Sequence, residues 1–199
     1  MIYLYQVFFL GLVYFVAAIP FGLIVSKKYA GKDIRNEGSG NIGATNVYRV
    51  AGKKLGFITF LLDSLKGALM VIIARYIFVE SKYLHLYLCA VSLTAVLAHI
   101  YPIYLNYKGG KGVATTLATL TALDPVVGFL SIVFWIMFFL MFRISAVSSI
   151  ISVFSSIILS CNYDSPKSQL FLCTILLIII IIRHKENIAR IILGEENKL

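Results

Sequence analysis

The stretch from Val113 to Phe142 reads VATTLATLTALDPVVGFLSIVFWIMFFLMF, and it decides how often this chain crosses a membrane. Its thirty residues contain one charge, Asp124. A single straight helix of this length would span about 45 Å, whereas the hydrocarbon core of a bilayer is about 30 Å thick. Proline removes an interior helix hydrogen bond, and Asp124-Pro125 lies near the middle of the stretch. The sequence therefore predicts a short helix over Val113–Leu123 and a full one over Pro125–Phe142.

The rest of the chain has the composition of an integral membrane protein. Of its 199 residues, 60% are hydrophobic and only 14% are charged, whereas about a quarter of the residues of a soluble domain are charged. The charges cluster and leave long apolar runs. Further spans are expected at Ile2–Val25, Leu55–Phe78, Leu84–Leu105, Ser145–Ser160 and Gln169–Ile182. We expect an all-α integral membrane protein of seven transmembrane helices, one of them short, in a single domain over residues 1–199.

The basic residues predict the orientation. A net charge of +9 could indicate a nucleic-acid partner, but basic residues also mark the cytoplasmic side of short membrane loops. With seven spans, seven basic residues between Lys27 and Lys54 share one side with seven later ones, which makes 14 of the 18 in the chain. With six spans, the C-terminal basic cluster would face outward. We therefore expect the N-terminus outside, the C-terminus in the cytoplasm and no nucleic-acid partner. The later seven are Lys108, Lys111, Arg143, Arg183, Lys185, Arg190 and Lys198.

A polar loop at Ser39 to Arg49, with the sequence SGNIGATNVYR, follows the first span. Gly40 and Gly43 let backbone N–H groups turn toward an anion. The loop also offers hydroxyl groups, side-chain amides and a guanidinium group suited to phosphate. These come from Ser39, Thr45, Asn41, Asn46 and Arg49. Such a loop at a membrane surface most simply binds a phosphorylated small molecule.

A second candidate phosphate site is a glycine-rich turn just before Val113. Gly109, Gly110 and Gly112 permit close approach of a ligand, Lys111 adds charge, and Thr115 follows with a hydroxyl. The helix that begins at Val113 would direct its positive N-terminus to the same point. The turn is not a nucleotide-binding P-loop, because no lysine directly precedes its threonines and no strand precedes it. The alternative is an ordinary basic membrane turn.

The third constellation is Arg183-His184-Lys185-Glu186-Asn187-Ile188-Ala189-Arg190, followed by Gly194 and Glu196. At helical spacing, His184 and Asn187 share a face. Histidine is the side chain best suited to proton transfer near neutral pH. A basic helix after a last span is also often only an orientation anchor, and the pattern alone leaves both interpretations open.

Further polar residues lie inside or near the spans. Asp63 and Lys66, three residues apart on the second span, are expected to form an ion pair that supports the site. His99 near the inner end of the third span is placed to orient the glycine turn. The three cysteines, Cys89, Cys161 and Cys173, have no paired spacing, so we expect neither a metal site nor a disulfide framework.

These motifs together resemble the bacterial acyl-phosphate:glycerol-3-phosphate acyltransferases, the PlsY family. The Ser39–Arg49 segment matches the family's Ser-Gly-Asn-x-Gly-Ala-Thr-Asn-x-x-Arg without a gap. Its second motif is matched by His99, Pro102 and Gly109 to Thr115, and its third by Arg183, His184, Asn187, Arg190, Gly194 and Glu196. Asp63, Lys66 and Gly67 match the Asp-x-x-Lys-Gly of the second span. The resemblance covers essentially the whole chain, and Ala98, Tyr101 and Tyr107 are mild departures from the usual residues.

The resemblance implies transfer of a long-chain acyl group from acyl phosphate to the 1-hydroxyl of glycerol 3-phosphate. The products are lysophosphatidate and inorganic phosphate, the first committed step of bacterial phospholipid synthesis. It implies no cofactor, a location in the bacterial inner membrane with a cytoplasmic active site, and a functional link to the soluble enzyme that makes acyl phosphate. Two alternatives remain: a transporter of an organic phosphate, and an acyltransferase that uses acyl-CoA or acyl-carrier protein.

The resemblance, together with the patterns above, predicts a role for each site residue. Catalysis is expected at His184, Asn187 and Lys111, and glycerol 3-phosphate binding at Ser39, Asn46, Arg49, His184 and Asn187. Acyl phosphate is expected at Gly40, Asn41, Gly43, Thr45, Gly109, Gly110, Lys111, Gly112 and Thr115. Asp63, Lys66, His99 and Glu196 are expected to support the site. His184 is either the general base or a group that holds the glycerol hydroxyls while a substrate phosphate takes the proton.

Overall fold

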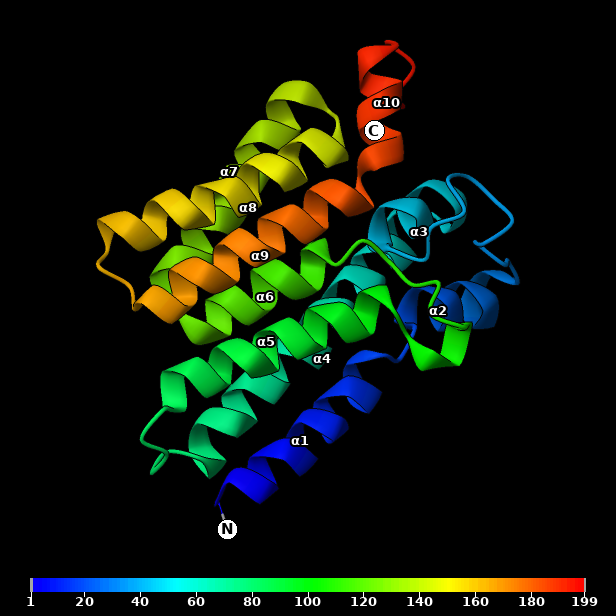
Figure 1. Ribbon diagram of the computed structural model, residues 1–199. Helices are drawn as coiled ribbons and strands as arrows, with labels where there is room; N and C mark the ends of the chain where they lie inside the picture. The colour runs from blue at the N-terminus through cyan, green and yellow to red at the C-terminus, as the bar shows by residue number, and fades with distance from the viewer. Residues whose placement is uncertain (1, 199) are drawn as a thin grey trace.

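The computed structural model describes residues 2–198, and these contain helices but no strand (Figure 1). The prediction of a single domain over residues 1–199 stays a prediction, and residues 1 and 199 lie outside the described residues. The helices are α1 Ile2–Ala17, α2 Phe21–Ala30, α3 Ala44–Ala51, α4 Lys53–Ile77, α5 Leu84–Ile100, α6 Val113–Leu123, α7 Pro125–Phe142, α8 Ser145–Asn162, α9 Lys167–Arg183 and α10 Lys185–Ile192, with a 3₁₀ turn at Ile103–Leu105 after α5.

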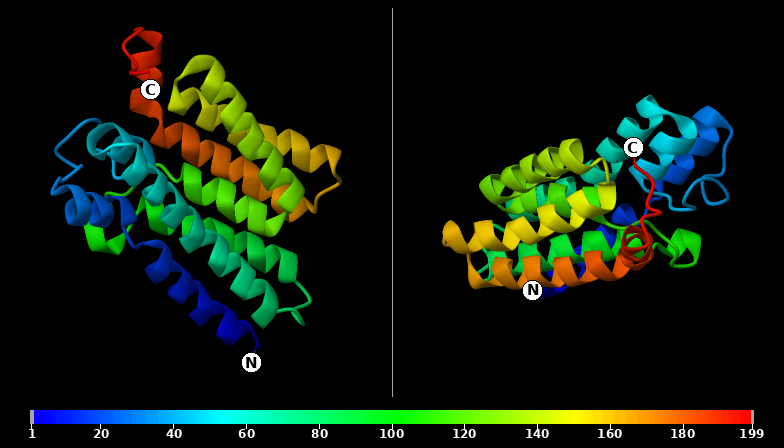
Figure 2. Two further views of the ribbon diagram at one scale, coloured as in Figure 1. Left: turned by 180° about the vertical axis from the view of Figure 1, so that it is seen from behind. Right: turned by 90° about the horizontal axis from the view of Figure 1, so that it is seen from above.

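The longer helices form one bundle and run alternately toward its two ends (Figures 1 and 2). The first described residues lie at one end and the C-terminal segment at the other. Five segments of the described chain are long and apolar enough to cross a membrane, and a sixth is added if α9 and α10, bent by 61°, count as one span. The apolar helix α6 is shorter. The protein is therefore an all-helical membrane protein, whereas the count of seven and the orientation stay predictions.

The predicted break at Asp124-Pro125 is confirmed. α6 ends at Leu123 and α7 begins at Pro125. Asp124 caps α7 because its Oδ1 accepts a hydrogen bond from the Val127 N–H at 3.2 Å, and proline suits the first helical position. Its Oδ2 accepts from Gln169 Nε2 at 2.9 Å, which ties the break to α9.

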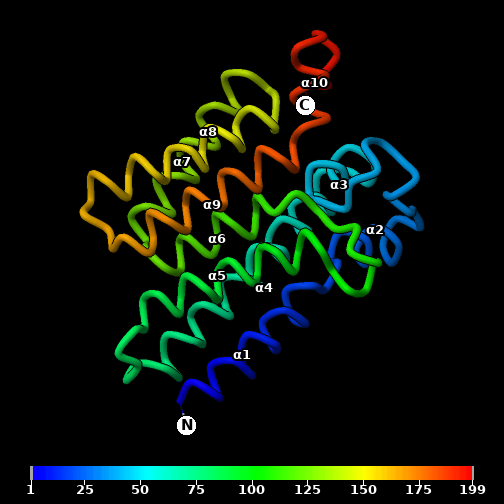
Figure 3. Tube along the Cα trace, viewed as in Figure 1, coloured from blue at the N-terminus to red at the C-terminus, as the bar shows by residue number. Residues whose placement is uncertain are grey.

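The predicted first span over Ile2–Val25 lies within the apolar segment Ile2–Ala30, but its helix is not continuous as expected. α1 ends at Ala17 and α2 begins at Phe21, and the interruption is visible in the trace of Figure 3. Pro20 has no N–H to continue the helix. A carbonyl freed at the interruption has a partner, because Lys66 Nζ donates a hydrogen bond to the Ile19 carbonyl at 2.9 Å. The break is therefore held by a side chain from α4.

The predicted polar loop is also partly helical. Thr45, Asn46 and Arg49 lie on α3, which begins directly after Gly43. The segment lacks the long apolar run of a span, but its Val47 is fully buried in a small cluster with Ile34 and Ile42. That local core, invisible in a scan for spans, explains why a polar stretch forms a helix here.

Small residues bring α4, α6 and α7 close together. A Cβ on Gly67 of α4 would lie 2.7 Å from a Thr115 methyl carbon of α6, and one on Gly128 of α7 would lie 2.2 Å from the Thr121 Cα. Close backbone approach through small residues is how helices associate within lipid. These contacts fix where α6 begins, and therefore where the glycine turn lies.

Candidate functional site

Three polar segments lie at the same end of the bundle (Figures 1 and 2). They are the segment from Ser39 to Arg49, the turn over residues 106–112 before α6, and the junction of α9 with α10. They are far apart in sequence, and the alternating helices bring them to one end. Basic residues of all three segments were expected on one side of the membrane from the placement of the spans.

The glycine turn and the C-terminal helix are joined by a polar network. Lys111 Nζ donates a hydrogen bond to Asn187 Oδ1. Asn187 Nδ2 donates to Glu196 Oε1 at 2.7 Å, and Arg190 Nε pairs with Glu196 Oε2 at 2.7 Å. The Glu196 side chain is 9% exposed. Glu196 therefore orients Asn187, which in turn meets Lys111.

Burial lowers the pKa of Lys111 to about 8, although the nearby Glu196 carboxylate opposes the shift. The ammonium group therefore keeps its charge at neutral pH and loses it under mildly alkaline conditions. A partly desolvated ammonium group with one neutral partner is suited to binding a phosphate dianion.

His184 lies beside this network and is almost fully buried. Its Nδ1 is 2.8 Å from the Ile180 carbonyl oxygen, so in the neutral ring Nδ1–H donates there and Nε2 carries the lone pair. Burial, followed by the charge of Lys111, lowers the pKa of His184 to about 4. The imidazole is therefore a neutral hydrogen-bond acceptor at physiological pH, and a weak base.

The glycine turn packs tightly on the end of α5. The Gly110 N–H donates to the His99 carbonyl at 3.2 Å and the Gly109 N–H to the Ile100 carbonyl at 3.0 Å. A Cβ on Gly110 would lie 2.0 Å from His99 Nε2, and one on Gly109 would lie 2.2 Å from the His99 carbonyl oxygen. The N–H groups of Gly109 and Gly110 thus have partners within the protein and shape the turn, while the predicted place of the two glycines in the acyl-phosphate site stays a prediction.

Two other residues predicted to bind acyl phosphate also have structural roles. The fully buried Thr115 donates its hydroxyl to the Asp63 carbonyl at 3.0 Å, so it joins α6 to α4. Gly112, at φ +89°, begins α6 as its N-cap and allows the chain to enter the helix. The groups available to an anion here are Lys111 and the free amides in the first turn of α6.

The Ser39–Arg49 segment is held by its own asparagines. Asn46 Oδ1 accepts the Ser39 N–H at 2.9 Å, and its Nδ2 donates to the carbonyls of Ile34 and Glu37, both at 3.0 Å. Asn41 Oδ1 accepts the Gly43 N–H at 2.9 Å. Asn41, Asn46 and the Gly43 amide thus shape the segment, and their predicted contacts with substrate stay predictions.

The remaining groups of this segment are open to a ligand. Ser39 and Gly40 are exposed, and Gly40 takes φ +69°. Arg49 is half-buried on α3 and forms no ion pair within residues 2–198. The Thr45 hydroxyl lies 3.2 Å from the Ser145 hydroxyl of α8. Ser39 and Arg49 therefore stay predicted ligands of a phosphate.

Below the site, the predicted ion pair is confirmed. Lys66 Nζ lies 2.8 Å from Asp63 Oδ1, and both side chains are buried. His99 Nδ1 is 3.6 Å from the same oxygen. Ile19 was not predicted as the partner of Lys66, although Pro20 in an apolar run was the available signal. No role was expected for Tyr101, whose ring centroid lies 5.8 Å from the Arg183 guanidinium carbon.

Arg183 holds the outer side of the same turn. Its Nη2 donates to the Gly109 and Gly110 carbonyls at 3.4 and 3.3 Å.

No group of three or more His, Cys, Asp or Glu side chains in the described chain could hold a metal ion.

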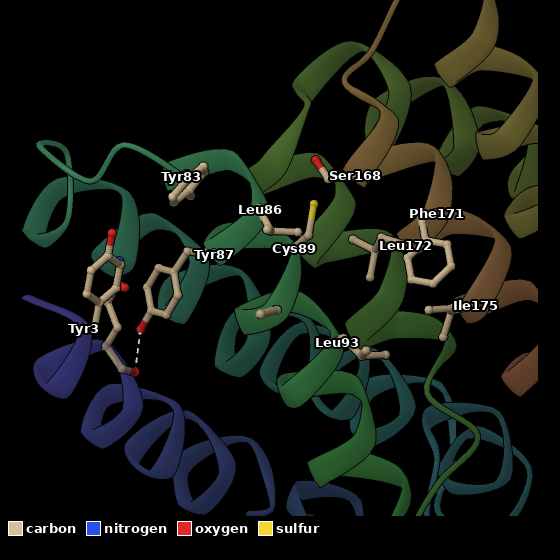
Figure 4. A pocket seen from close by; sticks show the side chains of 12 residues that line it. Tyr3, Tyr83, Leu86, Tyr87, Cys89, Leu93, Ser168, Phe171, Leu172 and Ile175 are labelled. Atoms are coloured by element: carbon tan, nitrogen blue, oxygen red, sulfur yellow. Dashed lines mark hydrogen bonds between the residues drawn. The ribbon is translucent and has the colours of Figure 1, made fainter.

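Two apolar cavities lie along the bundle. One, of about 350 Å³, runs between α4, α6 and α7 from Ala114 in the first turn of α6 to Ala122, with Phe60, Ala118 and Ile132 among its walls. The other, of about 410 Å³, lies toward the far end between α1, α5 and α9 (Figure 4). None of its lining residues is charged, and the Tyr87 hydroxyl beside it donates to the Gln6 carbonyl at 2.9 Å. Only the first cavity begins at the polar end.

Comparison with known proteins identifies relatives of this chain. Residues 7–194 match the family model described as glycerol-3-phosphate acyltransferase. A glycerol-3-phosphate acyltransferase of Desulfotalea psychrophila is 41% identical over 185 residues, 92% of each chain.

Two crystal structures of PlsY, an integral membrane glycerol 3-phosphate acyltransferase, are also similar. The glycerol 3-phosphate form matches with a TM-score of 0.90 at 38% identity, and the lysophosphatidic acid form with 0.88 at 37%. Each match covers 98% of this chain and 95% of the other. The chain therefore belongs to the PlsY family of integral membrane glycerol-3-phosphate acyltransferases.

Proposed function

We propose that the protein transfers a long-chain acyl group from acyl phosphate to the 1-hydroxyl of glycerol 3-phosphate. The products are lysophosphatidate and inorganic phosphate. The observation that carries the proposal is the contact of Lys111 with Asn187 beside the buried, neutral His184. Lys111 can bind one phosphate, and Asn187 and His184 can form hydrogen bonds with the glycerol hydroxyls. These three residues lie at the same end of the bundle as Ser39 and Arg49.

The two phosphates bind at different segments. Arg49 offers a planar fork that fits the phosphate of glycerol 3-phosphate, and Ser39 adds a hydroxyl. Lys111 and the free amides of α6 bind the phosphate of the acyl donor. The glycerol hydroxyls then lie against Asn187 and His184.

The reaction needs no protein nucleophile. An acyl phosphate is a mixed anhydride, so its carbonyl carbon is already activated. The 1-hydroxyl oxygen attacks that carbon, the carbon–oxygen bond to phosphate breaks, and Lys111 stabilises the charge on the departing phosphate. His184 Nε2 accepts a hydrogen bond from the glycerol and orients it.

The proton of the attacking hydroxyl passes to a substrate phosphate oxygen. With its pKa lowered to about 4, His184 is a weaker base than a phosphate dianion, whose second pKa is about 6. The structure thus favours His184 as a group that positions substrate over His184 as the general base.

The acyl chain lies in the cavity between α4, α6 and α7. This cavity starts at Ala114, three residues after Lys111, and its walls are almost wholly apolar. A donor with its phosphate at Lys111 can therefore extend its chain along α6 within the bilayer.

The proposed setting is the inner membrane of a bacterial cell, with the polar end in the cytoplasm. The basic residues of the first loop and of the C-terminal tail support that side. A soluble enzyme that makes acyl phosphate would then supply the donor from the same side.

The test is an assay of the purified protein with palmitoyl phosphate and glycerol 3-phosphate. Equal amounts of phosphate and lysophosphatidate should appear, while palmitoyl-CoA and palmitoyl-acyl-carrier protein should not replace the donor. Robust turnover with a thioester alone would contradict the donor assignment. Uptake of labelled glycerol 3-phosphate into proteoliposomes without any donor would favour a transporter.

A further inference from the structure

A buried ion pair lies on α4 between the two polar segments. The Asp63 and Lys66 side chains are 3% and 2% exposed, and their charged atoms are 2.8 Å apart. Their burial keeps both from direct contact with substrate at the polar end. A buried ion pair is weak evidence for a stabilising role. The contacts of Asp63 and Lys66 with other elements therefore indicate what the pair does.

Lys66 connects the pair to the Ser39–Arg49 segment. Its Nζ donates to the Ile19 carbonyl at 2.9 Å, in the interruption between α1 and α2. α2 then packs against the segment so closely that a Cβ on Gly22 would lie 1.9 Å from the Ile42 carbonyl oxygen. Ile42 is part of the segment, so any shift of α2 would be transmitted to it.

Asp63 connects the pair to the glycine turn. Its Oδ1 faces His99 Nδ1 at 3.6 Å, and the His99 ring lies directly against Gly110. Its backbone carbonyl also accepts the Thr115 hydroxyl at 3.0 Å, in the first turn of α6. Asp63 thus contacts elements on both sides of Lys111.

We propose that Asp63, Lys66 and His99 are positioning residues that place the two phosphate-binding segments relative to each other. Lys66 sets the Ser39–Arg49 segment through the α1–α2 break, and Asp63 with His99 sets the glycine turn. The inference rests on the proposed function, because it assigns one substrate to each segment. The attacking hydroxyl and the acyl carbon must lie close together, since a misplacement of about 1 Å can lower the reaction rate roughly a hundredfold.

The experiment measures KM for both substrates in two variants. Lys66→Met keeps the length of the side chain and removes its charge, so KM for glycerol 3-phosphate should rise about tenfold, with KM for palmitoyl phosphate within about twofold. His99→Phe keeps a ring against Gly110 but removes the nitrogen that faces Asp63. This variant should show the reverse pattern, because the glycine turn carries Lys111.

Matched controls separate positioning from a loss of folding. Met70→Leu, a volume-conserving change one turn further along the same helix, should leave both KM values unchanged. If Lys66→Met is unstable because it leaves Asp63 unpaired, the double variant Asp63→Asn/Lys66→Met removes both charges and should raise both KM values.

The KM values of the variants distinguish a positioning role from its alternatives. KM values at the wild-type level in both single variants would overturn the inference, and so would equal KM changes in the two. A lower kcat of the folded protein beside the selective KM change is expected, because misplaced substrates react slowly. An exchanged pattern would support positioning but reverse the assignment of substrates to segments. A wild-type protein without transferase activity would instead contradict the proposed function.

Discussion

At the residue scale, Lys111 determines how activity depends on pH. Its pKa of about 8 means that the free protein loses the ammonium charge as pH rises through 8. We expect kcat/KM for acyl phosphate to fall above about pH 8, because kcat/KM reports the ionisation of the free enzyme.

Lys111→Arg should be less active but should move this alkaline limb upward by more than one pH unit, since arginine stays protonated. Lys108→Arg, an exposed residue of the same turn, is the control and should leave the profile unchanged. A limb that stays at the same pH in Lys111→Arg would show that another group titrates.

His184 is the second residue with a testable role. If it positions glycerol and a phosphate takes the proton, His184→Gln should lower kcat about tenfold, the loss of one hydrogen bond of about 1 kcal/mol or slightly more. The acid limb of the pH–rate profile should persist. A thousandfold loss together with disappearance of that limb would identify His184 as the general base. His85→Gln, toward the other end of α5, serves as the control.

At the scale of elements, the cavity between α4, α6 and α7 should set the acceptable length of the acyl chain. Ala118 on α6 lies in its wall, several residues beyond Lys111. Ala118→Trp should lower kcat/KM for palmitoyl phosphate at least roughly tenfold and spare octanoyl phosphate, because each buried methylene contributes about 0.8 kcal/mol.

A competition assay with mixed chain lengths measures this preference. Ala90→Trp, in the wall of the other cavity, should not change it. An equal loss for both chain lengths in Ala118→Trp would place the acyl chain elsewhere.

The helices also show what a sequence pattern can and cannot indicate. The Asp124-Pro125 break was predictable because proline acts on its own helix. The break at Ile19-Pro20 was not expected, because it depends on Lys66, which is 46 positions later than Pro20 and approaches only through packing of α4 on α1 and α2.

At the scale of the whole molecule, the predicted orientation can be tested by cysteine labelling. In a background lacking Cys89, Cys161 and Cys173, single cysteines at Asn36, Lys108 and Lys198 should be reached by a membrane-impermeant maleimide from one side of the membrane only. A cysteine at Lys82, between α4 and α5, should be reached from the other side. All four positions are exposed.

Right-side-out and inverted vesicles distinguish the two faces. The first three positions should react in inverted vesicles, which expose the cytoplasmic side. Labelling of Asn36 and Lys108 on different sides would contradict both the span count and the single polar end.

The sequence by itself determined the class of the protein, the break at Asp124 and the Asp63–Lys66 pair, and it predicted one site for the three motifs. All of these depend on apolar length, on charge, or on residues close together in the chain. Tertiary structure alone decided which polar groups remain free. A phosphate site needs polar groups of the kind found on Asn46, Asn41, Gly109, Gly110 and Thr115. In the structure these groups form hydrogen bonds with Ser39, Gly43, the end of α5 and Asp63. Because each polar group forms only a few hydrogen bonds, the groups bonded within their own segment, to the end of α5 or to α4 are occupied, whereas Lys111, His184, Ser39 and Arg49 stay the proposed ligands of substrate.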